Sequence, residues 1–175
     1  IEACEGLIIR LPDITFGGNI SIDEPITINW GDDAEDIRFL TQGQRTLTDL
    51  NHRYGQNGDY SGYIQATDIE GKQTTMQFVV HVLNVAPQVV NVITPKVYLD
   101  TETVFGIRIE DPGLMDSHVI AIEWGDGSGA ATYEMRPGET TIELRHTFAS
   151  EVGRKPYDGT IVVDDKDGGR SSSNF

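Results

Sequence analysis

Cysteine, basic residues and long apolar runs are all scarce in this sequence. Its single cysteine, Cys4, excludes an intrachain disulfide, so the stability of the fold must come from packing. Cys4 is interpreted as an isolated thiol, with an intermolecular link as the alternative. Only 13 lysine and arginine residues stand against 28 acidic residues, for a formal net charge of −15, which disfavours nucleic acid and anionic membranes as partners. No apolar run reaches the roughly 18 residues that a membrane span requires.

Helical periodicity is also missing, and strict alternation takes its place. In the segments 26–30 and 120–124, apolar side chains occupy every second position up to a tryptophan. Period two with one apolar face is typical of a half-buried strand. Each of these strands ends at Gly-Asp, a dipeptide that favours tight turns. Short strands separated by turn signals predict an all-β sandwich.

The alternating pattern occurs twice at a fixed spacing. Trp30-Gly31-Asp32 returns as Trp124-Gly125-Asp126, 94 positions later, and His52 and His146 have the same spacing. A second strand pattern begins at Tyr60 and Tyr157, which are 97 apart, so the extra residues must lie in a surface loop at 149–156. Self-similarity at one period indicates a duplicated module.

The repeat predicts two tandem β-sandwich domains, 1–86 and 87–175, joined at Asn84-Val85-Ala86-Pro87, because proline cannot continue a strand ladder. Ile9-Arg10-Leu11 resembles Ile107-Arg108-Ile109, which leaves the first strand of domain 1 short or missing. Domain 2 ends before a full returning strand, so its last strand is truncated. We interpret this as a piece of a longer array; a terminus that accepts a strand from a neighbour is the alternative.

These motifs together resemble PKD (polycystic-kidney-disease-type) domains, an immunoglobulin-like β-sandwich family. The resemblance rests on Trp-Gly-Asp, on His52-Arg53-Tyr54 and His146-Thr147-Phe148, and on the acidic turn that ends with glycine at 164–169. Domain 1 departs from the family pattern at Asp33, where glycine is usual, and it lacks the Asp-Pro-Gly found at 111–113.

The resemblance implies an extracellular, cell-surface or secreted protein in which the domains act as spacer, adhesive or self-associating modules rather than as an enzyme. Its implied partners are neighbouring repeats and other copies of the same protein. The alternative is a substrate-binding accessory of a secreted hydrolase, with a polysaccharide or protein ligand.

Each recurring residue has a structural interpretation. The tryptophans are expected to pack between the sheets, and they would have to be exposed to stack on sugars instead. The aspartates after Trp-Gly are expected to accept backbone hydrogen bonds, and the recurring histidines to be largely buried and bonded to backbone or to a turn acid. Tyr60 and Tyr157 are expected to form tyrosine corners. His81 and His118 have no counterpart and are predicted to lie on the surface.

Calcium is the one cofactor that the sequence suggests. It prefers six to eight hard oxygen ligands, many of them carboxylates. The candidate ligands gather in two loops, and the alternative is that both are solvated acidic turns; the candidates are Asp111, Asp116, Asp164, Asp165 and Asp167.

Overall fold

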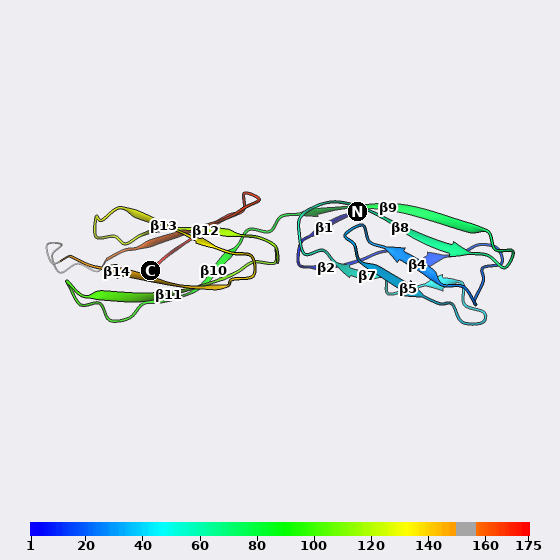
Figure 1. Ribbon diagram of the computed structural model, residues 1–175, viewed down its shortest axis with the longest axis horizontal. Coiled ribbons are helices and arrows are strands. Elements are labelled where there is room, and N and C mark those ends of the chain that lie inside the picture. Colours follow the sequence, from blue (N-terminus) through cyan, green and yellow to red (C-terminus); the bar gives the residue numbers. More distant parts are fainter. Residues whose placement is uncertain (150–156) are drawn as a thin grey trace. The chain divides into compact units, whose positions relative to one another are not determined.

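All the regular elements in the described part of the chain are β-strands, as the alternation predicts. The computed structural model describes residues 1–149 and 157–175, so the loop predicted at 149–156 lies, from 150 on, outside the described residues. The chain divides into two compact units, Ile1–Leu83 and Asn84–Phe175 (Figure 1). Each unit has its own apolar core. No helix of the described residues is long and apolar enough to cross a membrane.

The first unit combines one five-stranded sheet with two short, two-stranded sheets. The large sheet has the order β1-β9-β8-β4-β5, in which only the β1–β9 pair is parallel. The small sheets are β2-β7 and β3-β6. The strands are β1 (Glu2–Cys4), β2 (Ile8–Arg10), β3 (Ile14–Thr15), β4 (Ile26–Asn29), β5 (Glu35–Arg38), β6 (Thr46–Leu47), β7 (Asn51–Arg53), β8 (Gly58–Thr67) and β9 (Gln73–Leu83).

The second unit has one four-stranded and one three-stranded sheet, both antiparallel. Their orders are β13-β12-β15-β16 and β10-β11-β14, the immunoglobulin-like arrangement of two sheets. The strands are β10 (Gln88–Ile93), β11 (Glu102–Glu110), β12 (His118–Glu123), β13 (Ala130–Met135), β14 (Thr141–Thr147), β15 (Thr160–Asp165) and β16 (Arg170–Asn174).

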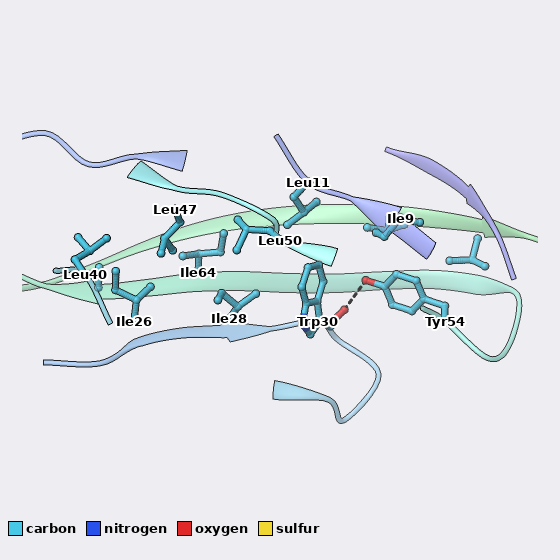
Figure 2. Close-up of a cluster of buried hydrophobic side chains, with 13 residues drawn as sticks. Ile9, Leu11, Ile26, Ile28, Trp30, Leu40, Leu47, Leu50, Tyr54 and Ile64 are labelled. Atoms are coloured by element: carbon cyan, nitrogen blue, oxygen red, sulfur yellow. Dashed lines mark hydrogen bonds between the residues drawn. The ribbon is translucent and has the colours of Figure 1, made fainter. Parts of the chain in front are cut away.

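The core of each unit lies between its sheets. In the first unit, Ile28 of β4 and Ile64 of β8 lie on the inner face of the large sheet, and Leu47 of β6 belongs to the same cluster from the other side (Figure 2). In the second unit, Ile120 and Ile122 of β12 are buried in the same way. Burying such side chains contributes about 1.5–3 kcal/mol each, which is the source of stability expected of a chain without disulfides.

The register of the histidine strands fixes how the two units correspond. His52 pairs with Ile9, and His146 pairs with Thr103, so the offset of 94 residues also holds for the strand beside each histidine. The predicted match of Ile9 with Ile107 is therefore wrong by four residues. A shift of four keeps every side chain on the same face of a strand, so the apolar alternation could not reveal it.

Two glycines on the inner face of the second recurring strand make room for an aromatic ring. A Cβ atom added at Gly62 would collide with the ring of Phe78, and one added at Gly159 would collide with the ring of Phe175. Phe78 and Phe175 are in turn next to Trp30 and Trp124, at 5.9 and 6.1 Å between ring centroids. Each unit thus has a glycine socket filled by a phenylalanine.

The turn after each tryptophan depends on a glycine in the left-handed region. Gly125 has φ 76°, and a Cβ atom there would lie 2.5 Å from the carbonyl oxygen of Asp158. Gly127 has φ 82° with nothing within 4 Å of an added Cβ atom. Strain alone therefore applies at Gly127, whereas strain and collision combine at Gly125.

We predict that Gly125→Ala lowers the free energy of unfolding of the second unit by clearly more than the roughly 1–2 kcal/mol of a left-handed alanine, and that Gly127→Ala costs no more than that. Urea unfolding with amide hydrogen exchange of β12 and β15 measures both losses. Equal losses for the two variants would contradict the collision.

Candidate functional site

The recurring residues come together as one cluster in each unit. In the first unit, Trp30 directly follows β4 and lies at the edge of the core, and Gly31 (φ 87°) turns the chain immediately after it. The Trp30 amide donates to the carbonyl oxygen of Ala34 at 3.0 Å, which closes the turn. Asp32 then accepts a hydrogen bond from the Ala34 amide at 3.3 Å. In the second unit, Asp126 accepts from the Ser128 amide at 3.0 Å.

An imidazole ring stacks on each indole. The ring centroids of Trp30 and His52 lie 4.7 Å apart with a 10° angle between planes, and those of Trp124 and His146 lie 4.4 Å apart with an angle of 2°. The His52 Nε2 atom is 2.7 Å from Asp32 Oδ2, and the corresponding distance from His146 to Asp126 is 2.8 Å. Because a carboxylate only accepts, each imidazole donates through Nε2. The turn acid and the histidine therefore form a bonded pair in both units.

A second aromatic layer continues the stack. Tyr54 packs edge-on against His52 and stacks on Tyr60, with ring centroids 4.6 and 4.3 Å apart. The Tyr54 hydroxyl donates to the Trp30 carbonyl oxygen at 2.9 Å (Figure 2). Burial, with a smaller contribution from Asp32, raises the pKa of Tyr54 to about 12. This hydroxyl therefore stays protonated at neutral pH and remains a donor.

The second unit repeats this layer without the hydroxyl. Phe148 takes the place of Tyr54 and stacks on Tyr157 at 4.6 Å. In the first unit, the Tyr60 hydroxyl donates to the carbonyl oxygen of Gln56, four residues upstream, at 2.8 Å, the geometry expected of a tyrosine corner. Burial raises the pKa of Tyr60.

The clusters face inward. Trp30 is 1% exposed and Trp124 is 3% exposed, so neither indole offers a face to a sugar. Among residues 1–149 and 157–175, no histidine ring is hydrogen bonded to a serine or cysteine, so the His–Asp pairs activate no nucleophile there. The arrangement can fix a turn and join two sheets. The aspartate and the histidine of each cluster are hydrogen bonded to each other in doing so.

The two histidines without counterparts differ from each other. His81 is exposed, as predicted, and pairs with Asp59 at 2.6 Å. His118 is 4% exposed, so the prediction of a surface position was wrong for it. Its Nε2 atom lies 2.7 Å from Asp111 Oδ2, and Asp111 Oδ1 accepts from the Gly113 amide at 2.8 Å. The sequence signal for this pair is the Asp-Pro-Gly turn seven residues before a strand that begins with histidine.

The five acidic residues proposed for calcium fall into two groups. Asp164 accepts from Arg170, at 2.5 Å from Nε and 2.8 Å from Nη2, and these bonds hold its pKa below the usual range. Asp165 accepts the amides of Asp167 and Gly169 at 2.9 and 2.7 Å, so it caps its own hairpin. Asp165 also accepts from Asn84 Nδ2 at 3.0 Å and is 7% exposed, so it is a buried turn cap rather than a solvated acid.

The other two acids lie close together. Asp111 and Asp116 each have a carboxylate oxygen within 4.8 Å of the other. Lys166 Nζ lies 3.3 Å from Asp116 Oδ1 and 3.8 Å from Asp167 Oδ2, and His118 donates to Asp111. The calcium prediction, with its five candidate acids, stays a prediction; of these acids, Asp111 and Asp116 have carboxylate oxygens close to each other.

No protein-family model matches the sequence, and no curated protein sequence matches it. Solved structures with weak similarity to the chain include the following three. They are cadherin domains 3–6 of protocadherin gamma B2 (19% identity, TM-score 0.31, 86% of this chain and 38% of that one), SGBP-B of the Bacteroides ovatus mixed-linkage glucan utilization locus with a heptasaccharide (18%, 0.27, 99% and 41%), and a carbohydrate-binding module of the β-sandwich superfamily (11%, 0.28, 86% and 81%). The chain thus spans about two fifths of the first two, and all three TM-scores are too low to bear on function.

The Asp126–His146 pair predicts a specific pH dependence of stability. Burial acts to raise the pKa of Asp126, but hydrogen bonds from Ser128 and His146 outweigh it and hold the pKa below its usual 3.8. A depressed carboxylate pKa stabilises the fold above the unfolded pKa, and this stabilisation is lost as pH falls through the folded pKa. We expect Asp126→Asn to be less stable than wild type at pH 5–7, with the difference narrowing below pH 3.8.

Urea unfolding between pH 2 and pH 7 measures this difference. The matched control is Glu134→Gln, because Glu134 is an exposed acid in the same unit. A constant difference between Asp126→Asn and wild type across the whole range would contradict the role given to the pair.

Thermal unfolding tests the calcium prediction. A ligand that binds only the folded state raises stability by mass action. Wild type should therefore melt at a higher temperature in millimolar calcium than in chelator, and Asp111→Asn should abolish the difference. Asp164→Asn, whose carboxylate is held by Arg170, should keep it. Identical melting temperatures of wild type in calcium and chelator would end the calcium interpretation.

Proposed function

We propose that the chain is a non-catalytic structural module of an extracellular protein, made of two PKD-type sandwiches. In this role it spaces or joins neighbouring parts of a longer surface, matrix or fibre protein. Its partners are then neighbouring repeats of the same protein and, in an assembly, other copies of it.

The observation that carries this proposal is where the repeated residues are used. In both units the duplicated Trp, Asp, His and aromatic side chains bond to one another or pack in the core. A duplicated catalytic or binding site would instead direct some of its polar groups to an open pocket. Duplication that preserves only internal contacts is what a repeated structural unit requires.

Charge supports the same interpretation. The formal net charge of −15 keeps such a chain soluble in an exposed setting. The ion pairs of the described surface, such as Arg145–Glu102 and Arg108–Glu110, are exposed and contribute little to stability. The folding energy therefore comes from the two cores, which suits units that work one after another along a chain.

The alternative function, a substrate-binding accessory, has one surface feature in its favour. On the outer face of the β10-β11-β14 sheet, Gly106 leaves a hollow of about 430 Å³ between Ile93 and the strands beside it. Arg108 and Glu143 also line it. Its lining has no aromatic ring, so it lacks the stacking surface that sugar recognition commonly uses.

Mechanical unfolding tests the structural proposal. We expect single chains of residues 1–175 pulled from their ends to unfold in two separate events, each releasing roughly 300 Å of chain. Gly125→Ala should lower the unfolding force of one event and leave that of the other unchanged, because Gly125 lies in the second unit.

Binding and activity assays provide the contrary outcomes. The same chain should show no retention on insoluble polysaccharides and no hydrolysis of polysaccharide or protein substrates. Retention that Arg108→Ala or Glu143→Ala abolishes would favour the accessory function. Hydrolysis by the purified chain would overturn the proposal.

A further inference from the structure

The first unit has an apolar groove beside its shortest sheet. The groove has a volume of about 310 Å³, and its walls come from β3, the chain after it, and the inner faces of β8 and β9. Its apolar lining consists of Ile14, Phe16, Ile20, Ile64, Ala66 and Met76. Met76 is 42% exposed although it alternates with the inward-facing residues Phe78 and Val80 of β9, so the groove leaves a side chain of the inner face uncovered.

The second unit shows what covers the same place in the duplicate. Ile14 pairs with Leu47 in the first unit, and Arg108 pairs with Thr141 in the second, again at an offset of 94 residues, so β3 corresponds to the C-terminal half of β11. The other edge of that half of β11 is paired with β10, through Ile109 with Val89 and Ile107 with Val92. Within residues 1–149 and 157–175, no strand pairs with the corresponding edge of β3.

In the second unit, the strand β10 covers this part of the core. Its side chains Val89 and Val92 pack against the core cluster, and β10 lies beside Ser173 of β16. By the offset of 97 residues, Ser173 corresponds to Met76, and it is half-buried where Met76 is exposed. The groove therefore has the position, the apolar walls and the open strand edge that a strand like β10 requires.

We propose that the groove beside β3 is a strand-acceptor site: it binds an extended peptide segment that pairs antiparallel with β3 and buries branched aliphatic side chains at the positions of Val89 and Val92. Backbone hydrogen bonds to the open edge provide affinity, and the groove provides the pockets for the side chains. The proposal does not depend on the proposed function, because an acceptor groove can serve a spacer or a binding module.

The segment Gln88–Thr94 is the probe, attached directly ahead of Ile1 in the full chain. At the offset of 94 residues Ile1 corresponds to Pro95, so the tether gives the grafted strand the connection that β10 has to its own unit. A tethered segment also binds at high effective concentration. The control is the same graft with Val89→Asp and Val92→Asp in the grafted copy only.

We expect the graft to slow amide hydrogen exchange of β3 by about tenfold or more relative to the control graft, and to raise the melting temperature of the first unit. Met76→Glu, at the exposed wall of the groove, should remove both effects while leaving the second unit unchanged. The same protection in a concentration-dependent dimer would also support the site, with the strand donated by a second copy.

Two results would overturn the proposal. One is equal exchange at β3 with the graft and with the aspartate control. The other is protection that appears at β11 or β16 instead of β3, which would mean that the graft competes with β10 in the second unit. Failure here leaves the mechanical and binding tests of the structural role untouched.

Discussion

An indole stacked on an imidazole holds the two sheets of each unit together. Trp30 follows β4 of the five-stranded sheet, whereas His52 belongs to β7 on the opposite side of the core, so the contact at 4.7 Å joins the layers directly. The carboxylate of Asp32 then bonds the imidazole to the turn that the tryptophan begins. These two contacts fix the turn and the strand before it to the opposite sheet. The second unit has the same two contacts.

This dependence explains why the two units agree so closely in some positions and differ freely in others. The left-handed glycine after each tryptophan cannot change, because the backbone of Ser61 or Asp158 passes against it. Two residues further on the space is open, and there the first unit has Asp33 at φ 68° where the second has Gly127 at φ 82°. Aspartate tolerates the left-handed region better than most residues. The departure at Asp33 from the usual glycine therefore leaves the turn intact.

Much of this arrangement could be predicted from the sequence, since it occurs twice. Alternation identified the strands that end at Trp30 and Trp124, and the fixed spacing linked each to a histidine. The sequence left open whether each histidine bonds to backbone or to a turn acid, and it is the turn acid that bonds in both units. The stacking of the rings could not be read from spacing, because it depends on how two distant strands face each other. The correspondence of Ile9 with Thr103 could not be predicted for a related reason. Strand periodicity distinguishes the two faces of a strand but not positions along one face.

Features that occur in only one unit were the hardest to predict. His118 has no counterpart, so nothing in the repeat indicated that it would be buried against Asp111. The acidic residues near 165 were ambiguous for a different reason, since the same composition suits an ion site and a hairpin cap. Asp165 accepts hydrogen bonds of 2.9 and 2.7 Å from the amides of Asp167 and Gly169, so in this structure the side chain caps its own hairpin.

The phenylalanine that fills each glycine socket has a consequence for how such repeats can diverge. Gly62 and Phe78 face each other on neighbouring strands of one hairpin, as do Gly159 and Phe175. A larger residue at the glycine position fits only if a smaller residue replaces the phenylalanine, so neither position can be substituted alone. Among descendants of this module the two sites should covary, and recombination that exchanges whole hairpins would preserve the fit.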